Sequence, residues 1–273
     1  MKCNIQNTLE IQVPDEFADL ADPFNNEWGD DDGQAWETKN FIEVTKDKKV
    51  IIDVGAHIGF FSFCFIVNNN ADATKKAHSF EPSPWGAENF LQIKDYNNED
   101  KRFDNISFYN RFMGDTMGEK RFVVEEGAMT FAVLYERDDP FFKVIKSPDE
   151  SSDKKTIDVV TVDNFSAWLE KNNESFADVI KIDVEGFDCR VLQGAITTLK
   201  ETRPLVLLEV HQRLLRLYNN TVMNVYELMS SELDYDFYDN KMNKIEDKDS
   251  YIRLFKDKSE IRLICNPKEA GNL

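Results

Sequence analysis

Continuous apolar runs recur along the chain, separated by longer stretches of mixed character. A run of four to eight apolar residues without polar alternation is typical of a strand that is buried on both faces. Gly55 ends the first of these runs, and Glu81 with Pro82 closes the second. We predict parallel-sheet strands over residues 50–54, 77–80, 106–113, 179–183 and 205–210, and a further extended segment over 157–162.

The stretches between these runs have the length and spacing of helices. Phe187, Val191, Ala195 and Leu199 recur every four residues, which places them on one helix face. We predict helices over residues 58–67, 85–96, 165–171, 187–199 and 214–233. Alternating strands and helices indicate an α/β fold with a mainly parallel sheet covered on both faces.

Three further features complete the predicted organisation. Residues 120–134 have the pattern of an inserted β-hairpin, and the polar stretch 136–155 is predicted to be a mobile loop. Residues 235–238 and 260–265 are predicted to pair as antiparallel closing strands of a seven-stranded sheet. We divide the chain into an acidic, irregular segment, residues 1–48, which is a candidate lid, and a domain over residues 49–273.

Charge narrows the classes of partner. The chain has 33 Lys and Arg against 51 Asp and Glu, a formal net charge of −18, which disfavours nucleic acid as a partner.

The longest apolar run is too short to span a membrane, and no apolar leader follows Met1. The four cysteines are scattered and show no C-x-x-C pair. These features favour free thiols and a cytoplasmic location.

Candidate binding residues follow the first two strands. Ligands of parallel sheets bind beyond the carboxyl ends of the strands, where the strand order reverses. The first strand leads into D-V-G-A-H-I-G, in which Gly55 allows a tight turn and Gly59 allows a close approach of helix and sheet. Glu81 ends the next strand and offers two acceptor oxygens to ribose hydroxyls. The loop lacks the G-x-G-x-x-G pattern of dinucleotide sites, so a nucleoside without a pyrophosphate suits it better.

Titratable residues follow the last two parallel strands. Asp183 and Glu185 are two positions apart, as are Glu209 and His211. Alternation along a strand places each pair on one side, and parallel strands end at the same edge of the sheet. We therefore expect three acids and a histidine to converge there.

These segments together carry a family resemblance. The segments I-I-D-V-G-A-H-I-G, F-E-P-S-P, I-K-I-D-V-E-G-F-D-C-R-V-L-Q-G-A and R-P-L-V-L-L-E-V-H resemble the FkbM family of S-adenosylmethionine-dependent methyltransferases, over residues 50–211. The resemblance implies a class I, Rossmann-like methyltransferase fold and an O-methyltransferase acting on a hydroxyl of a sugar, glycan or secondary metabolite. The chain departs from the family at His57 and Ser83, where asparagine is usual or frequent.

The resemblance gives the candidate residues their roles. We expect His211 to be the general base, with Asp183 and Glu185 orienting the acceptor hydroxyl or sharing that role. Asp183, Glu185, Glu209 and His211 also offer ligands for a divalent metal, which the chemistry does not require. The expected S-adenosylmethionine-binding residues are Asp53, Gly55, His57, Gly59, Glu81 and Asp115.

Two other functions remain open at this point. A nicotinamide-dependent oxidoreductase would place a ribose-binding acid at the position of Glu81. A non-catalytic module would keep the nucleoside site without the chemistry. Convergence of four titratable residues at one edge of the sheet argues against such a module, because buried charges are rarely kept without a partner or a role.

Overall fold

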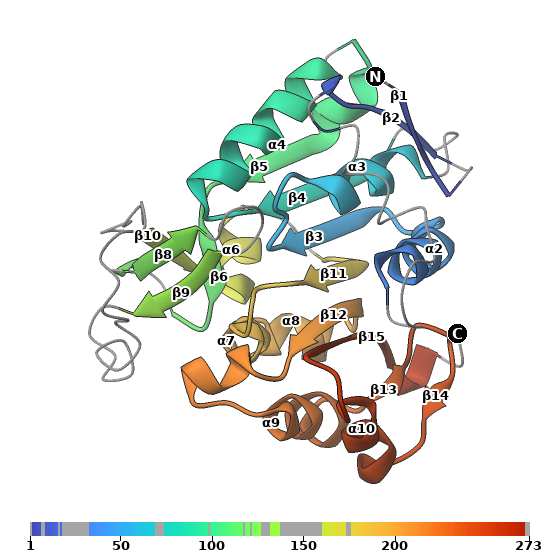
Figure 1. The fold of residues 1–273 in the computed structure, drawn as a ribbon, viewed down its shortest axis with the longest axis vertical. Coiled ribbons are helices and arrows are strands. Elements are labelled where there is room, and N and C mark those ends of the chain that lie inside the picture. Colours follow the sequence, from blue (N-terminus) through green and yellow to red (C-terminus); the bar gives the residue numbers. More distant parts are fainter. Residues whose placement is uncertain are drawn as a thin grey trace.

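A single eight-stranded sheet forms the centre of the protein (Figure 1). The structure is a computed structural model that describes residues 2–6, 9–15, 17, 33–68, 74–97, 99–116, 118–120, 122–126, 132–136, 160–172 and 176–270. The sheet has the strand order β14-β13-β15-β12-β11-β3-β4-β5. Its strands are β3 (Val50–Val54), β4 (Lys76–Phe80), β5 (Ile106–Tyr109), β11 (Val179–Ile182), β12 (Leu205–His211), β13 (Tyr235–Tyr238), β14 (Lys244–Ile245) and β15 (Glu260–Pro267).

The directions of the strands confirm the predicted class of sheet. The five strands from β5 to β12 pair in parallel, whereas β15 runs antiparallel between β12 and β13. The strand order reverses between β3 and β11, which makes their carboxyl ends the expected ligand edge. The prediction of seven strands misses only β14, a two-residue strand at the edge that pairs with β13.

Helices cover both faces of the sheet, and neighbouring strand residues point to opposite faces. Ile51 belongs to one hydrophobic core and Ile52 to the other. The core that contains Ile51 is covered by the hairpin of β1 (Lys2–Ile5) and β2 (Leu9–Gln12), by α2 (Gln34–Thr45), α3 (Phe60–Val67) and α4 (Pro84–Tyr96), and by the 3-10 helix η2 (Lys101–Asn105).

The helices that cover the opposite core come from the second half of the chain. Its covering elements are α6 (Phe165–Lys171), α7 (Asp188–Gly194), α8 (Ile196–Glu201), the 3-10 helix η3 (Leu214–Tyr218), α9 (Val222–Tyr226), the π-helix η4 (Glu227–Glu232) and α10 (Lys248–Leu254). The 3-10 turn η5 (Lys268–Ala270) follows β15. Among the described residues, no helix combines the length and the apolar character that a membrane crossing requires.

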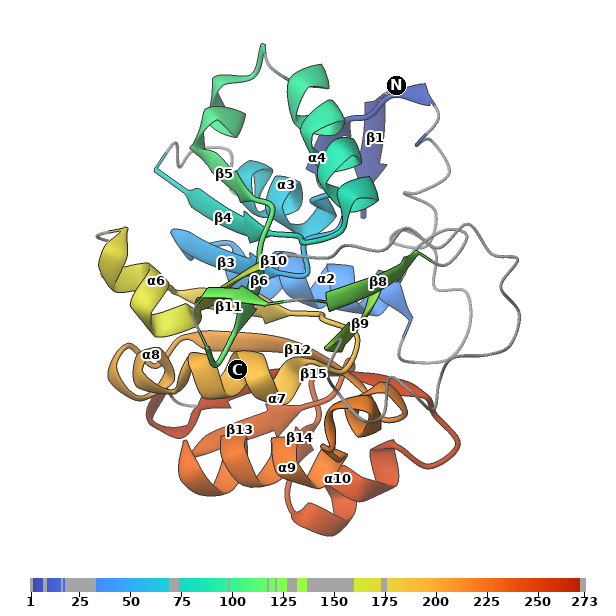
Figure 2. The ribbon, with the colours of Figure 1, turned by 90° about the vertical axis from the view of Figure 1, so that its left-hand side faces the viewer.

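The prediction that the N-terminal segment is irregular is wrong for much of its described part. Cys3 and Ile5 are buried while Asn4 is exposed, and Leu9 and Ile11 repeat this alternation, which is the pattern of a half-buried hairpin. Figure 2 shows β1 beside α3 and α4, at the end of the molecule away from α10. Most of the acidic positions, residues 18–32, lie outside the described residues, so the lid stays a prediction.

The predicted third strand is two strands in the structure. A tight turn ends β5, where the Arg111 N–H donates to the Tyr109 carbonyl at 2.9 Å. The chain then leaves the main sheet, and β6 (Phe112–Gly114) joins β10 (Val160–Asn164) and β7 (Gly118–Lys120) in a small second sheet. The predicted hairpin is confirmed as β8 (Phe122–Glu126) and β9 (Ala132–Glu136). Residues 137–159 lie outside the described residues, so the predicted mobile loop is not tested.

Two predicted helices are interrupted. The helix predicted over 214–233 is divided into η3, α9 and η4, because Asn219 adopts a left-handed conformation with φ of 58° and Thr221 begins a new capped helix. The helix predicted over 187–199 is divided at Ala195 into α7 and α8. Its predicted face is nevertheless buried, from Phe187 at 8% exposure to Leu199 at 0%.

Close packing of α7 against β6 gives a test of the fold. A Cβ atom on Gly194 would lie 1.8 Å from the carbonyl oxygen of Gly114. Alanine favours a helix over glycine by about 1 kcal/mol, but forced overpacking costs about 1–3 kcal/mol or more. We therefore expect Gly194→Ala to lower the free energy of unfolding, measured by chemical denaturation. The exposed neighbour Gln193 provides the control Gln193→Ala. Equal stability of the two variants would contradict the packing.

Candidate active site

A cavity of about 260 Å³ lies at the carboxyl ends of β3, β4 and β11. This is the edge at which the strand order reverses, as the sequence predicted. Residues from the loops after these three strands, from β6 and from α2 line the cavity. It brings together Gly55, His57 and Glu81 on one side and Asp183 and Glu185 on the other.

Two glycines shape the loop after β3. Gly55 has φ of 81°, and a Cβ atom there would lie 1.8 Å from the Asp183 carbonyl oxygen, so no larger residue fits. The N–H groups of Gly55 and Ala56 both donate to the Phe80 carbonyl at 2.9 Å, which ties the loop to β4. Gly59 does not line the cavity. A Cβ atom on Gly59 would lie 2.5 Å from the ring of Phe90, so this glycine lets α3 and α4 pack closely.

Glu81 is held rigidly beside this loop. One carboxylate oxygen accepts the His57 N–H at 2.9 Å and the other accepts the Ser83 N–H at 2.8 Å. Each oxygen keeps a second lone pair that can accept a hydroxyl from a ligand. Burial raises the pKa of Glu81, and the Ser83 hydroxyl and the two backbone donors oppose that shift. Gly86 on α4 leaves the space for this side chain, because a Cβ atom there would lie 2.7 Å from the Glu81 Cγ.

His57 lines the cavity as a neutral side chain. Its backbone is left-handed, with φ of 51°, and its ring stacks on Trp85 at a centroid distance of 5.0 Å. Burial lowers the pKa of His57. Its buried Nε2 atom has no hydrogen-bond partner among the described residues, so it can donate to or accept from a ligand.

Asp53 and Asp115 differ in their positions. Asp53 is 1% exposed, lines the cavity and accepts the Ser62 hydroxyl at 2.6 Å, and burial raises its pKa. Asp115 does not line the cavity and instead pairs with Arg190 of α7 at 2.7 Å. Its predicted role in cofactor binding stays a prediction.

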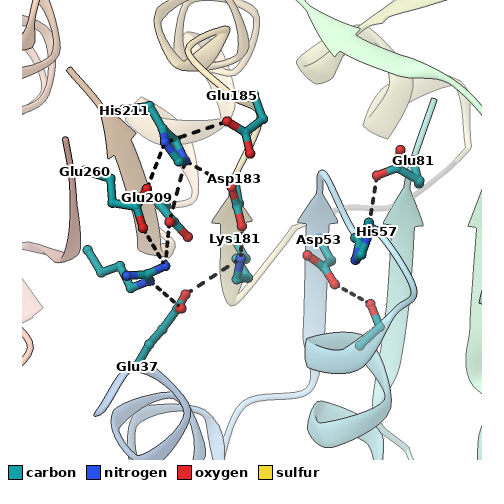
Figure 3. A network of polar contacts seen from close by, with 12 residues as sticks. Glu37, Asp53, His57, Glu81, Lys181, Asp183, Glu185, Glu209, His211 and Glu260 are labelled. Carbon is teal, nitrogen blue, oxygen red and sulfur yellow. Dashed lines mark hydrogen bonds and ion pairs between the residues drawn. The ribbon is translucent and has the colours of Figure 1, made fainter. Parts of the chain in front are cut away.

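The four titratable residues predicted at the sheet edge do converge. Around the His211 imidazole, Nε2 lies 3.5 Å from Glu209 and 3.8 Å from Asp183 (Figure 3). Its Nδ1 lies 3.7 Å from Glu185 and 3.4 Å from Glu260. Burial opposes a charge on His211, but these carboxylates outweigh it and raise its pKa to about 10. His211 is therefore an imidazolium at neutral pH.

Two buried cations balance these carboxylates. Lys181 lies 3.3 Å from Asp183 and 3.7 Å from Glu37, with its ammonium over the ring of Phe61. Arg262 binds the carboxylates of Glu37 at 2.9 Å, Glu209 at 2.7 Å and Glu260 at 3.3 Å. Burial alone would raise the pKa of Asp183, but Lys181 and His211 hold it well below its usual range. We call Glu37, Lys181, Asp183, Glu185, Glu209, His211, Glu260 and Arg262 the charge cluster.

Half of this cluster was not predicted from the sequence. Lys181 interrupts an apolar strand, which is a usable signal for a buried charge with a partner. Arg262 and Glu260 show their role only through the register of β15, which places them opposite Glu209 and His211. Glu37 gives no sequence signal, because nothing in the sequence shows that α2 packs at this edge.

Glu185 has the properties of a group poised for proton transfer. Its side chain lines the cavity, and burial is the main reason that its pKa is raised to about 7. Its backbone has φ of 51°, a left-handed conformation that costs about 1–2 kcal/mol for a residue with a side chain. Such local strain is often found at functional sites.

Part of the cluster has the geometry of a cation site. Ligand atoms of Asp183, Glu209 and His211 lie within 4.8 Å of one another, while Glu185 faces the other nitrogen of the imidazole. Carboxylates with one imidazole suit a divalent ion. Lys181 and Arg262 already supply positive charge, and the His211 imidazolium would have to lose a proton before it could coordinate an ion, so the cluster does not need one.

Comparisons with known proteins were made against families, curated proteins and solved structures. The chain matches the methyltransferase FkbM domain over residues 53–237. No curated protein matches it. The solved methyltransferase FkbM from Methylobacillus flagellatus KT has 14% sequence identity and a TM-score of 0.49, over 81% of this chain and 44% of that one. This chain therefore spans less than half the length of that relative.

Two other solved methyltransferases are similarly distant. The O-methyltransferase from Bacillus cereus, solved in a complex with SAH, has 11% identity and a TM-score of 0.44, over 85% of this chain and 80% of that one. Precorrin-6y C5,15-methyltransferase from Geobacter metallireducens GS-15 has 10% identity and a TM-score of 0.41, over 84% and 87%. The family match covers more than half of the residues and shows that this chain belongs to the FkbM methyltransferase family, and the observed sheet is that of the class I methyltransferase fold.

Proposed function

We propose that this protein transfers a methyl group from S-adenosylmethionine to a hydroxyl oxygen of a sugar, a glycan or a secondary metabolite. One observation carries the proposal. A single cavity has a glycine loop and a fixed carboxylate on one side and a proton-accepting carboxylate on the other. Membership of the FkbM family supports methyl transfer and argues against the nicotinamide-dependent oxidoreductase. The strained, titratable Glu185 argues against a non-catalytic module.

The residues around Gly55 and Glu81 fit the adenosyl part of the cofactor. The loop at Gly55 approaches the sheet edge so closely that a side chain would fill the space. Glu81 has lone pairs for ribose hydroxyls, and Nε2 of His57 offers one further polar contact. Bound S-adenosylmethionine supplies a methyl group on a positively charged sulfur. The protein then has to align the acceptor oxygen and remove its proton.

The charge state of the cluster indicates which residue accepts the proton of the acceptor hydroxyl. Because His211 is held as an imidazolium, it has no lone pair with which to accept a proton at neutral pH. Glu185 lines the cavity and titrates near neutrality, so we assign it the role of general base. The hydroxyl proton moves to the Glu185 carboxylate as the oxygen attacks the methyl carbon. His211 and Asp183 orient the base and the acceptor.

The acceptor and the location of the protein follow from weaker observations. A net charge of −18 disfavours nucleic acid, so we propose a small molecule or a glycan as the acceptor. All four cysteines are buried and free, which suits the reducing environment of the cytoplasm.

Binding of the demethylated cofactor tests the nucleoside site. We expect S-adenosylhomocysteine to bind in calorimetry and NADPH not to bind. Glu81→Gln should weaken binding by about ten- to hundredfold, since hydrogen bonds to a charged acceptor contribute about 1.5–3 kcal/mol. The exposed Glu88 on α4 provides the matched control Glu88→Gln. Equal affinity of the wild type and Glu81→Gln would remove Glu81 from the site.

The same variants serve the direct test of activity. Incubation with isotope-labelled S-adenosylmethionine and a glycan or metabolite extract, followed by mass analysis, should reveal a labelled O-methyl product. Glu81→Gln is the negative control. Label found only on nitrogen, or in nucleic acid, would refute the proposed acceptor class.

The pH dependence of turnover tests the assignment of the base. A carboxyl group accepts a proton only when it is ionised, so kcat should rise about tenfold per pH unit below pH 7 and level off above it. Turnover should fall again near pH 10, where His211 loses its proton. Glu185→Gln should abolish the acidic limb and lower kcat by about a hundredfold or more. Loss of the acidic limb in His211→Asn, with Glu185→Gln unaffected, would instead assign the base role to His211.

Removal of metal tests whether the cation site matters. Lys181 and Arg262 already balance the carboxylates, so we expect full turnover after exhaustive chelation with EDTA. Added Mg²⁺ should change turnover by less than about twofold, because no ligand set in the described cluster depends on it. A loss of turnover that Mg²⁺ restores would show that a divalent ion takes part.

A further inference from the structure

Glu37 lies between the two buried cations of the charge cluster. Its Oε2 accepts a hydrogen bond from Nε of Arg262 at 2.9 Å, and its Oε1 lies 3.7 Å from Nζ of Lys181 (Figure 3). All three side chains are nearly buried, with 13% of Glu37, 10% of Arg262 and 3% of Lys181 exposed. Glu37 also lines the cavity, although it belongs to α2, which precedes the matched family domain.

Both cations that contact Glu37 also contact carboxylates that face the His211 imidazole. Lys181 contacts Asp183, which faces Nε2 of His211. Arg262 contacts Glu209 and Glu260, which face Nε2 and Nδ1 of the same ring. Glu37 is therefore linked to the carboxylates around His211 in two ways, once through Lys181 and once through Arg262.

Attachment of α2 to the protein does not explain this carboxylate. Phe41 of α2 is 1% exposed and packs edge-on against Phe61 at a centroid distance of 4.9 Å. The Asn40 side chain donates to the Asn240 carbonyl at 2.6 Å. These contacts hold the helix, and burying an ion pair is often no more stabilising than burying apolar residues in its place. A role for Glu37 in the cluster accounts for its burial better than docking alone.

We propose that Glu37 is a positioning residue of the methyl-transfer site, and that α2 is thereby part of the active site. It separates Lys181 and Arg262, so that each cation is presented to a different carboxylate beside His211. The inference rests on the proposed function for its catalytic meaning, but the arrangement of charge that it claims is measurable without turnover.

Replacing Glu37 should change the charge balance around His211. Without this carboxylate, the cluster loses one negative charge, and Lys181 and Arg262 form ion pairs only with the remaining acids. The imidazolium is then held less tightly. The carboxyl groups that act on His211 are Asp183, Glu185 and Glu209 with Glu260 of β15 and the buried Asp188 of α7.

The chain has only three histidines, so a histidine NMR titration can follow His211 directly. The full-length protein, with EDTA present, is titrated as wild type, Glu37→Gln and Glu37→Asp. His211→Asn identifies the signal. We expect the His211 midpoint to fall by about one pH unit in Glu37→Gln, the order of shift for a unit charge removed from a partly buried cluster. Glu37→Asp keeps the charge on a shorter side chain and should give a smaller shift in the same direction.

A second glutamate on α2 provides the control. Glu43 is 73% exposed and pairs with Lys46, so Glu43→Gln should leave the His211 midpoint unchanged. An unchanged midpoint in both Glu37 variants would overturn the proposal. If Glu37→Gln does not fold, Glu37→Asp decides the question alone.

Two further measurements separate this inference from the proposed function. Calorimetry with S-adenosylhomocysteine is run on each variant, and absence of binding to the wild type counts against the function whatever the histidine midpoints show. With a methyl acceptor in hand, Glu37→Gln should lower kcat by about tenfold with its affinity for S-adenosylhomocysteine unchanged. Unchanged kcat beside a shifted midpoint would reject the positioning role while leaving the function in place.

Discussion

The contact between the loop after β3 and the end of β11 governs the layout of the active site. Gly55 approaches the Asp183 backbone so closely that there is no room for a Cβ atom. This contact places the side of the cavity that carries Glu81 directly beside the side that carries Asp183 and Glu185. Parallel strands on either side of a reversal in strand order naturally separate at their ends. The glycine keeps that separation small enough for the residues on both sides to line one cavity.

On the side of the cavity that carries Asp183 and Glu185, neighbouring cations balance the charges of only some of the carboxylates. A buried carboxylate without a partner would take up a proton or destabilise the fold. Lys181, His211 and Arg262 keep Asp183 ionised, whereas Glu185 faces only one cation of the charge cluster, the His211 imidazolium, and burial raises its pKa to about 7. Environment, rather than residue type, thus divides the carboxylates into those that hold charge and one that exchanges a proton.

The parts of the site that the sequence predicted are those set by local pattern. Gly55 and Glu81 follow short apolar runs, and the topology of a parallel sheet is enough to bring them together. Asp183, Glu209 and His211 converge for the same reason. The remaining charges depend on long-range packing: Arg262 needs the antiparallel register of β15, and Glu37 needs the docking of a helix far away in the chain.

The same distinction applies to the fold. The buried strands were predicted nearly to the residue, because their apolar runs have sharp ends. The single strand predicted over 106–113 fails because the chain turns at Asn110, whose amide donates to the Glu81 carbonyl at 2.8 Å. The long helix predicted over 214–233 fails at Asn219, where a left-handed residue interrupts an otherwise helical pattern. In both places an asparagine satisfies backbone geometry that apolar periodicity does not register.

The left-handed backbone at Glu185 lowers the stability of the fold at the residue that we propose as the base. A glycine at this position would relax the main chain and remove a poorly solvated acid, and both changes favour the folded state. Under the function that we propose, selection for thermal stability alone would favour a more stable protein that lacks its base. A bulky, ionisable residue in so unfavourable a conformation is the structural cost of the role that we propose for Glu185.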